Sequence, residues 1–273
     1  AYLIDRAEEI KQRDPEFRER IVKLKVQYRM PPVLGDFVSD MFYKGELENG
    51  IKDPEAFKQN YPVIGGLNMV WIHVPSNLEN QKTNSFKSFF RKTEAEVIIN
   101  LLKKIEEQVW KEIRTEKKEN EQNGRDRTEA KIGIITGYSA QRDLLEKEIG
   151  IQAQKDNCFE NLKNYIEIGT VDSFQGKQFD IVILSFVRTN GYGFWSIKEK
   201  QGPWEIPWAG NHRTCVAFSR AKKCMIVVGD KTLFSGRLAE KAKVEVPAFV
   251  EFYNRCEEEK DGVCKVLDKS EVE

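Results

Sequence analysis

A polar segment between two apolar runs constrains the fold of this 273-residue chain more than any other feature. Residues 170–176 read TVDSFQG and follow an apolar stretch, and residues 180–187, DIVILSFV, form a second apolar run almost at once. Short runs rich in β-branched side chains are typical of buried strands. Open α/β sheets bind ligands where such strands end in polar groups. The segment therefore predicts a sheet with a ligand site beside it.

Strand and helix patterns alternate along the rest of the chain. Further strands are expected at residues 22–26, 68–74, 132–136 and 224–229, and helices at residues 33–41, 93–109, 137–149, 211–221 and 248–255. This alternation predicts an α/β fold, a mostly parallel sheet covered by helices on both faces. Thr93 and Glu96 stand at the spacing of a helix capping box.

The remaining segments are expected to be irregular. Residues 44–66 contain several Gly and Pro and are predicted to be a loop, and the polar residues 77–92 are predicted to be mobile. The charged run 111–127 is interpreted as the solvated end of a helix followed by a flexible loop. Residues 1–20 are expected to be a helical lead-in from a preceding domain, residues 21–258 one domain, and residues 259–273 a frayed tail.

Composition limits the classes of function. Lys+Arg and Asp+Glu are equal at 44 each, so any contact with nucleic acid must come from a local patch or from the rest of a larger protein. No run approaches eighteen apolar residues, which argues against a membrane partner. The five cysteines lack CxxC pairing, and we interpret them as reduced thiols of an intracellular protein, cytoplasmic or nuclear. The absence of an initiating Met suggests an excised segment.

Three motifs occur in a characteristic order. Residues 27–32, QYRMPP, with the following run 36–47, resemble motif IV of the 5′-to-3′ branch of superfamily 1 helicases, which contains the nonsense-mediated-decay helicase and senataxin. Residues 170–177, TVDSFQGK, resemble motif V of the same family. Residues 216–222, VAFSRAK, resemble motif VI, usually VALTRAR. Each motif stands at a predicted junction of strand and helix, so the chain resembles the second, C-terminal RecA-like domain of these enzymes.

The resemblance implies a nucleotide site. It places Arg29 and Arg220 at the γ-phosphate of ATP as arginine fingers, and a planar, permanently charged guanidinium suits that role. Gln27 and Tyr28 are expected to contact the nucleotide, with the Tyr28 ring on the adenine. Gly176 would lie beside the γ-phosphate, where a side chain would obstruct the approach. Gln178 stands where the family often has an acidic residue that contacts the sugar.

The resemblance also implies a nucleic-acid track. Residues 133–142, GIITGYSAQR, resemble the family's GIITPY…QR segment, with Gly137 in place of the usual Pro. The residues expected on the track are Tyr138, Gln141, Arg142, Thr170 and Asp172. Cys215 replaces a usual Asn, and Arg213 either supports the phosphate site or pairs with an acid.

The chain lacks a GxxxxGK[ST] loop and an acidic Walker-B strand ending. In helicases both belong to the first RecA-like domain, which would supply the ligands of the Mg²⁺ that accompanies ATP. We therefore expect the N-terminal RecA-like domain of the same protein and single-stranded DNA or RNA to be the partners. The complete protein would be an ATP-dependent helicase, and this chain alone would be inactive.

Several alternatives stay open. The chain could be a non-catalytic module, derived from a helicase, that binds nucleic acid or protein. It could also belong to a helicase–nuclease fusion. Trp195, Trp204 and Trp208 lie in one loop that either stacks on bases or, as we favour, folds over its own sheet. Neither His73 nor His212 has a partner at metal-ligand spacing, and no metal site is predicted.

Overall fold

The computed structural model describes residues 24–79, 82–85, 88–122, 130–155, 159, 162–189, 211–235 and 238–273. The lead-in predicted for residues 1–20 and the loop with Trp195, Trp204 and Trp208 lie outside the described residues.

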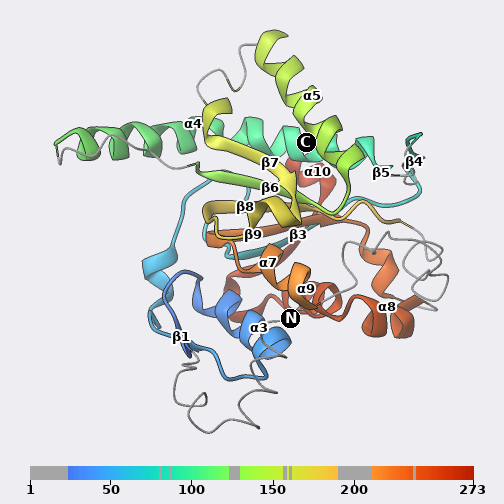
Figure 1. Cartoon of the computed structure of the whole chain (residues 1–273), viewed down its shortest axis with the longest axis horizontal. Helices are drawn as coiled ribbons and strands as arrows, with labels where there is room; N and C mark the ends of the chain where they lie inside the picture. Colours follow the sequence, from blue (N-terminus) through green and yellow to red (C-terminus); the bar gives the residue numbers. More distant parts are fainter. Residues whose placement is uncertain are drawn as a thin grey trace, which may run out of the picture.

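A six-stranded parallel sheet forms the centre of the molecule (Figure 1), in the order β10-β3-β9-β8-β6-β7. The strands are β3 (Met69–His73), β6 (Ile132–Thr136), β7 (Ile166–Thr170), β8 (Phe179–Ser185), β9 (Ala221–Gly229) and β10 (Cys264–Asp268). Strands β3, β6 and β8 are buried along their whole length. Near-continuous apolar sequence is what a parallel strand covered on both faces requires.

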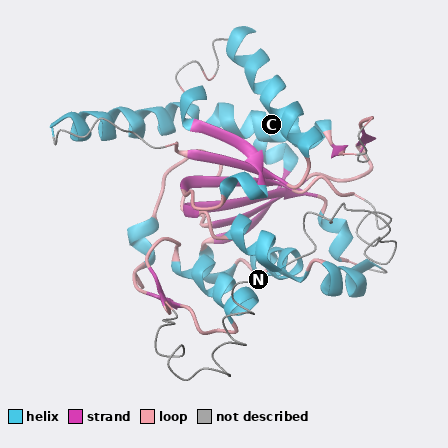
Figure 2. Cartoon of the chain, viewed as in Figure 1, coloured by secondary structure: helices cyan, strands magenta, loops and turns pink. Residues whose placement is uncertain are grey.

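Helices cover both faces of the sheet (Figures 1 and 2). One layer holds α4 (Lys92–Gln122), α5 (Ser139–Lys155) and α10 (Lys269–Val272). The other holds α3 (Pro32–Tyr43), α7 (Asn211–Phe218), α8 (Ala239–Glu245) and α9 (Pro247–Glu257). Two separate clusters of buried apolar side chains fill the spaces between the sheet and these layers. The predicted three-layer α/β fold is therefore confirmed.

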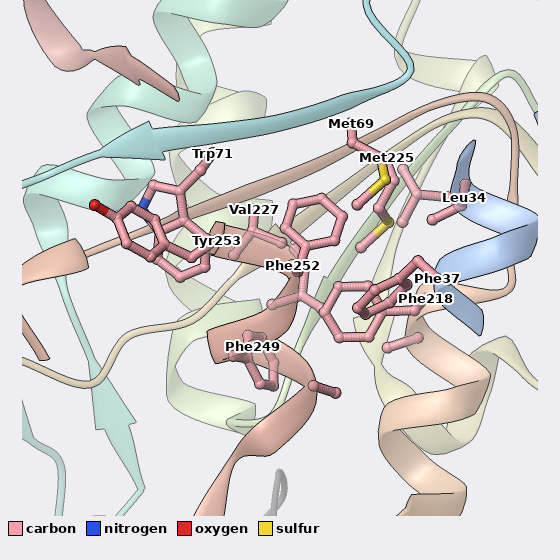
Figure 3. Close-up of a cluster of buried hydrophobic side chains, with 14 of the residues drawn as sticks. Leu34, Phe37, Met69, Trp71, Phe218, Met225, Val227, Phe249, Phe252 and Tyr253 are labelled. Atoms are coloured by element: carbon pink, nitrogen blue, oxygen red, sulfur yellow. The ribbon is translucent and has the colours of Figure 1, made fainter. Parts of the chain in front are cut away.

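Interlocking aromatic rings join three helices of the second layer (Figure 3). The Phe37 ring of α3 lies 5.0 Å from the Phe218 ring of α7 and 5.5 Å from the Phe252 ring of α9, centroid to centroid. The Phe218 ring also lies 5.2 Å from that of Phe249. All four side chains are fully buried, and aromatic edge contacts of this kind add to the free energy gained by burial. This cluster fixes the beginning of α3 and the end of α7 relative to each other.

The prediction of a frayed tail at residues 259–273 is wrong. After the short 3₁₀ helix η6 (Lys260–Gly262), β10 pairs with β3 along its full length, from Cys264 opposite Met69 to Asp268 opposite His73. Leu267 and Val272 are buried in the apolar cluster beneath α4. The segment is therefore an ordered edge strand and a helical turn, because it buries apolar side chains that a solvated tail would expose.

Two segments predicted as irregular contain short strands. Strand β2 (Glu48–Asn49) pairs in parallel with β1 (Val26–Gln27), and β4 (Lys82–Thr83) pairs antiparallel with β5 (Phe89–Phe90). Short 3₁₀ helices complete the chain at η1 (Pro54–Phe57), η2 (Lys163–Tyr165), η3 (Val171–Phe174) and η4 (Lys231–Phe234).

The predicted capping box at Thr93 is also wrong. Helix α4 begins at Lys92, and the Thr93 N–H donates to Glu79 Oε2 at 2.9 Å, in the segment before the hairpin. A carboxylate from outside the helix thus satisfies an N-terminal donor that the local motif was expected to satisfy.

Candidate functional site

The predicted site residues lie at the two ends of the parallel strands. We call the end where the strands begin the amino edge of the sheet, and the end where they finish the carboxyl edge. Strand β7 ends at Thr170, on the edge where the parallel strands reach their carboxyl ends. The chain then returns through η3 to begin β8 at Phe179, on the amino edge. Thr170 and Gln178 therefore lie at different edges although they are close in sequence. Motif V therefore runs from the carboxyl ends of the strands toward their amino ends.

Two arginines meet at the amino edge. Arg29 Nη1 donates to the Ser219 carbonyl oxygen at 2.9 Å, and Arg29 Nε donates to Gln178 Oε1 at 3.0 Å. Arg220 Nη2 donates to Ser219 Oγ at 2.7 Å, and Arg220 Nη1 to the Lys177 carbonyl oxygen at 3.2 Å. The structure thus brings together Arg29, Gln178 and Arg220, which come from all three motifs.

The two positively charged side chains, Arg29 and Arg220, donate their hydrogen bonds to neutral acceptors. Both side chains are half-buried, and every acceptor that binds them in the described part of the chain is a carbonyl, an amide or a hydroxyl. Burial lowers the pKa of the Arg220 guanidinium, and the nearby charge of Arg29 lowers that pKa further. Two guanidinium groups so arranged would bind an anion such as a phosphate group with charge-assisted hydrogen bonds.

A side-chain bracket builds the turn that presents Arg29. Gln27 Oε1 accepts from the backbone N–H groups of Arg29 and Met30 at 2.8 and 2.7 Å. Its Nε2 donates to the Met30 carbonyl at 3.0 Å and to Asn49 Oδ1 at 2.6 Å. The amide thereby uses its full capacity of two acceptor and two donor bonds. The Gln27 side chain thus folds the turn in this structure, and its expected contact with the nucleotide stays a prediction.

Tyr28 is free to contact a ligand. Tyr28 is 67% exposed and directly precedes Arg29 in the sequence. The ring lies against Gly50, where an added Cβ would be 2.2 Å from Tyr28 Cε1. Only glycine leaves room for the ring in this position. The exposed ring can stack on a planar group such as a nucleobase.

Gly176 lies in the loop between η3 and β8. Its φ angle is +84°, which disfavours residues with a side chain. It is exposed, and a Cβ added to it would meet no other atom within 4 Å. A ligand can therefore approach its backbone closely. The next residue, Lys177, pairs with Glu167.

The carboxyl edge carries the predicted nucleic-acid residues. Arg142 is half-buried near the start of α5, and its guanidinium pairs with Asp143 at 2.6 Å. Asp172 is exposed and pairs with Arg213 at 3.1 Å, so Arg213 has an acidic partner. Thr170 is half-buried at the end of β7. Tyr138 is 7% exposed, and burial raises its pKa to about 12.

The prediction that Gln141 contacts nucleic acid is contradicted. Its side chain is fully buried. Gln141 Oε1 accepts from the Arg91 N–H at 2.8 Å, and Nε2 donates to the Arg91 carbonyl at 3.2 Å and to Ser185 Oγ at 3.0 Å. A polar residue in the first turn of a helix is usually exposed, but this one connects α5 to α4 and β8.

Sequence reasoning missed the partners of Gln141. Arg91 and Glu94 are fully buried at the start of α4, although charged residues are almost never buried unless paired. The only signal in the sequence is their position at the start of a helix with one continuous apolar face. Sequence reasoning also missed Tyr43, whose hydroxyl lies 3.9 Å from the Sγ of Cys215, the residue that replaces the family's usual Asn.

The cysteines of the described ranges, Cys215, Cys224, Cys256 and Cys264, are free thiols, and Cys158 lies outside those ranges. Within the same ranges no three His, Cys, Asp or Glu side chains gather closely enough to hold a metal ion. No helix of the described chain has the length and apolarity needed to cross a membrane.

A parallel sheet between two helical layers, with motif residues at its edges, defines a RecA-like α/β domain. A protein-family model described as an AAA domain matches residues 3–232. The chain is 32% identical over 219 residues to "Regulator of nonsense transcripts 1 homolog" of Neurospora crassa, covering 77% of this chain and 16% of that protein.

Two further proteins of similar sequence support the same family. "Regulator of nonsense transcripts 1 homolog" of Drosophila melanogaster is 33% identical over 214 residues, which cover 77% of this chain and 15% of the relative. "ATP-dependent helicase NAM7" of Saccharomyces cerevisiae is 31% identical over 173 residues, covering 62% and 15%. The chain thus belongs to this AAA-domain family and, within it, to the superfamily 1 helicases of the nonsense-decay branch. It spans about a sixth of the length of these relatives.

Proposed function

We propose that this chain is the second RecA-like motor domain of an ATP-dependent helicase, supplying two arginine fingers and part of a single-strand track. The observation that carries the proposal is the convergence of Arg29 and Arg220 on Ser219, with neutral acceptors around both charges. The name of the yeast relative, an ATP-dependent helicase, supports ATP as the anion that the pair binds.

The nucleotide would lie between this domain and a first RecA-like domain. Arg29 and Arg220 reach the γ-phosphate from the amino edge, the exposed Tyr28 ring stacks on the adenine, and the Gly176 backbone lies beside the phosphates. Gln178, which already accepts from Arg29, contacts the sugar through its remaining amide group. The described residues offer no ligand cluster for Mg²⁺, so the first domain would hold that ion.

The arginine pair couples nucleotide to domain closure. Its attraction to the γ-phosphate favours the closed cleft, because the closed state alone makes these contacts. Loss of the γ-phosphate removes the attraction and the cleft reopens. An arginine finger contributes about 10³–10⁵ in rate when another surface supplies nucleotide and Mg²⁺, so the chain alone should hydrolyse little ATP.

The strand would lie along the carboxyl edge. Thr170, Arg142 and the exposed margin of Tyr138 face this edge, and Asp172 lies in the turn that follows β7. Helix η3 connects the carboxyl edge to Gly176 at the amino edge. Motif V would therefore link the bound nucleic acid to the nucleotide directly. Cycles of closure would then move the domain along the strand.

The test is steady-state ATP hydrolysis by the full-length protein, with and without single-stranded DNA and RNA of equal length. Stimulation by a strand supports the motor, and the better activator identifies the substrate. A folded protein without stimulated hydrolysis, or without the first RecA-like domain, would instead establish a non-catalytic binding module.

A further inference from the structure

A buried ion pair that the proposed function does not use lies at the N-terminal end of α4. Arg91 and Glu94 are both fully buried, with Arg91 Nη1 3.3 Å from Glu94 Oε1. Burial raises the pKa of the Glu94 carboxyl, and the charge of Arg91 opposes that shift. A buried pair is costly to desolvate, so its presence calls for a structural or functional reason.

Arg91 binds the end of β3. Its guanidinium donates to the carbonyl oxygens of Val74 at 2.9 Å, Pro75 at 2.7 Å and Glu79 at 2.9 Å. These carbonyls belong to the chain that leaves the sheet at its carboxyl edge. The arginine therefore fixes this segment to the beginning of α4.

Glu94 binds the end of β8. Its Oε2 accepts from Ser185 Oγ at 2.7 Å, and both carboxylate oxygens accept from the Val187 N–H, at 3.0 and 2.9 Å. Val187 has a φ of +71°, a left-handed conformation that is strained for a β-branched residue. The buried carboxylate thus holds the backbone of β8 at the point where it turns sharply away from the sheet.

The same network holds the start of α5. Gln141 exchanges hydrogen bonds with the backbone N–H and carbonyl of Arg91 and donates to Ser185 Oγ, which in turn donates to Glu94. Arg142, the next residue, is half-buried and lies on the proposed nucleic-acid track. The network consequently sets the position of this residue.

The segment that follows β8 also contacts Tyr138 on the proposed nucleic-acid track, through Arg188. Arg188 follows Val187, and its guanidinium lies 4.2 Å from the centroid of the Phe89 ring and 5.7 Å from that of the Tyr138 ring. The Phe89 and Tyr138 rings meet edge to face at 5.5 Å. The backbone that Glu94 holds therefore continues into the packing around Tyr138.

We propose that Glu94 is a positioning residue for nucleic-acid binding. It holds the end of β8 and the start of α5 so that Tyr138 and Arg142 contact the nucleic-acid strand in one geometry. The inference rests on the proposed function, because it deepens the role of the carboxyl edge. In this proposal Glu94 does not contact the nucleic acid itself. It acts through Ser185, Val187 and Gln141.

Glu94→Gln in the full-length protein tests the proposal. The variant keeps the shape of the side chain but replaces an acceptor by an amide that cannot accept at both positions. We expect the dissociation constant for a single-stranded oligonucleotide, measured by fluorescence anisotropy, to rise about tenfold. The KM for ATP without strand should stay unchanged, because the arginine pair lies at the other edge. Glu96→Gln, an exposed position two residues along α4, is the matched control and should change neither quantity.

A double variant separates positioning from general destabilisation. If Glu94 acts through the turn that ends in Arg142, Glu94→Gln should weaken binding much less in an Arg142→Ala background than in the wild type. Additive losses would contradict the proposal. A folded Glu94→Gln protein with unchanged strand affinity would overturn it, as would equal losses of strand affinity and ATP affinity.

Ser185→Ala decides the matter if Glu94→Gln does not fold. This milder change removes the hydroxyl shared by Glu94 and Gln141 and should weaken binding of the nucleic-acid strand about threefold. Unchanged binding would overturn the proposal. A wild-type protein without strand-stimulated ATP hydrolysis would refute the proposed function itself, a result distinct from these.

Discussion

Arg29 and Arg220 bind the same residue, Ser219, one at its carbonyl oxygen and the other at its hydroxyl. Arg29 precedes α3 and Arg220 follows α7, and the ring of Phe37 packs against that of Phe218 between these two helices. The aromatic core thus determines how far apart the two charges lie. Since their acceptors are neutral, both charges remain available to an anion.

Replacing Gly176 by Ala separates nucleotide binding from stability. No atom lies near the added Cβ, so the cost is that of a left-handed conformation, about 1 kcal/mol. If the backbone approaches a phosphate at this point, the methyl group should raise the KM for ATP severalfold. Steady-state kinetics and thermal unfolding of the full-length protein measure the two effects.

Gly262→Ala is the control for this experiment. Gly262 also has a positive φ and open space around it, but it precedes β10, which strands β3 and β9 separate from β8. It should lower stability by a similar amount and leave the KM unchanged. Equal values of KM for both variants would remove Gly176 from the nucleotide site.

His73 predicts a pH dependence of stability. Burial lowers its pKa, and its Nδ1 accepts from the Lys231 N–H at 3.2 Å, a bond that protonation would break. The unfolded chain, with a histidine pKa of about 6.5, therefore binds the proton more readily than the folded chain. Stability should fall as the pH drops below about 6.5 toward the lower pKa of the folded state.

His73→Gln should flatten this dependence, because glutamine keeps an acceptor but does not titrate. Urea unfolding of the chain from about pH 5 to about pH 8, which brackets the ordinary histidine pKa, provides the comparison. Identical pH profiles for both proteins would show that other groups control acid sensitivity.

Leu267 tests whether the C-terminal segment is part of the fold. Its side chain is 2% exposed in β10, and Leu→Ala at buried sites costs about 2–5 kcal/mol. At roughly 2–4 °C per kcal/mol for a domain of this size, the melting temperature should fall by about 4–20 °C. Leu78→Ala, at a leucine that is 48% exposed, should change it little. Equal melting temperatures for the two variants would mean that the segment is a tail after all.

The sequence predicts the central strands of the sheet well and the outermost strand, β10, poorly. Strand β6 occupies residues 132–136 as predicted, because five apolar or small residues between polar flanks leave few alternatives. Strand β10 was missed because Lys265 and Asp268 interrupt a short apolar pattern. Such a strand is recognisable only from its partner, β3, which lies far away in the sequence.

The arginine pair could be predicted from motifs, but the roles of the glutamines could not. Gln27 and Gln141 were expected to contact ligands because the resemblance to superfamily 1 helicases placed them there. Both instead satisfy backbone groups inside the protein. Those groups are brought close only by tertiary folding, which also explains why the buried Glu94 went unrecognised.

The most direct test of the central claim is Arg220→Ala in the full-length protein, with Arg114→Ala on α4 as a surface control. Duplex unwinding and binding of a single strand are measured side by side. The account predicts that unwinding driven by ATP is lost while affinity for the nucleic-acid strand stays within about twofold, because Arg220 lies at the amino edge proposed for the nucleotide and the nucleic acid is proposed to bind at the carboxyl edge. Equal loss of unwinding and binding, or unwinding at the wild-type rate, would contradict the assignment of Arg220 as an arginine finger.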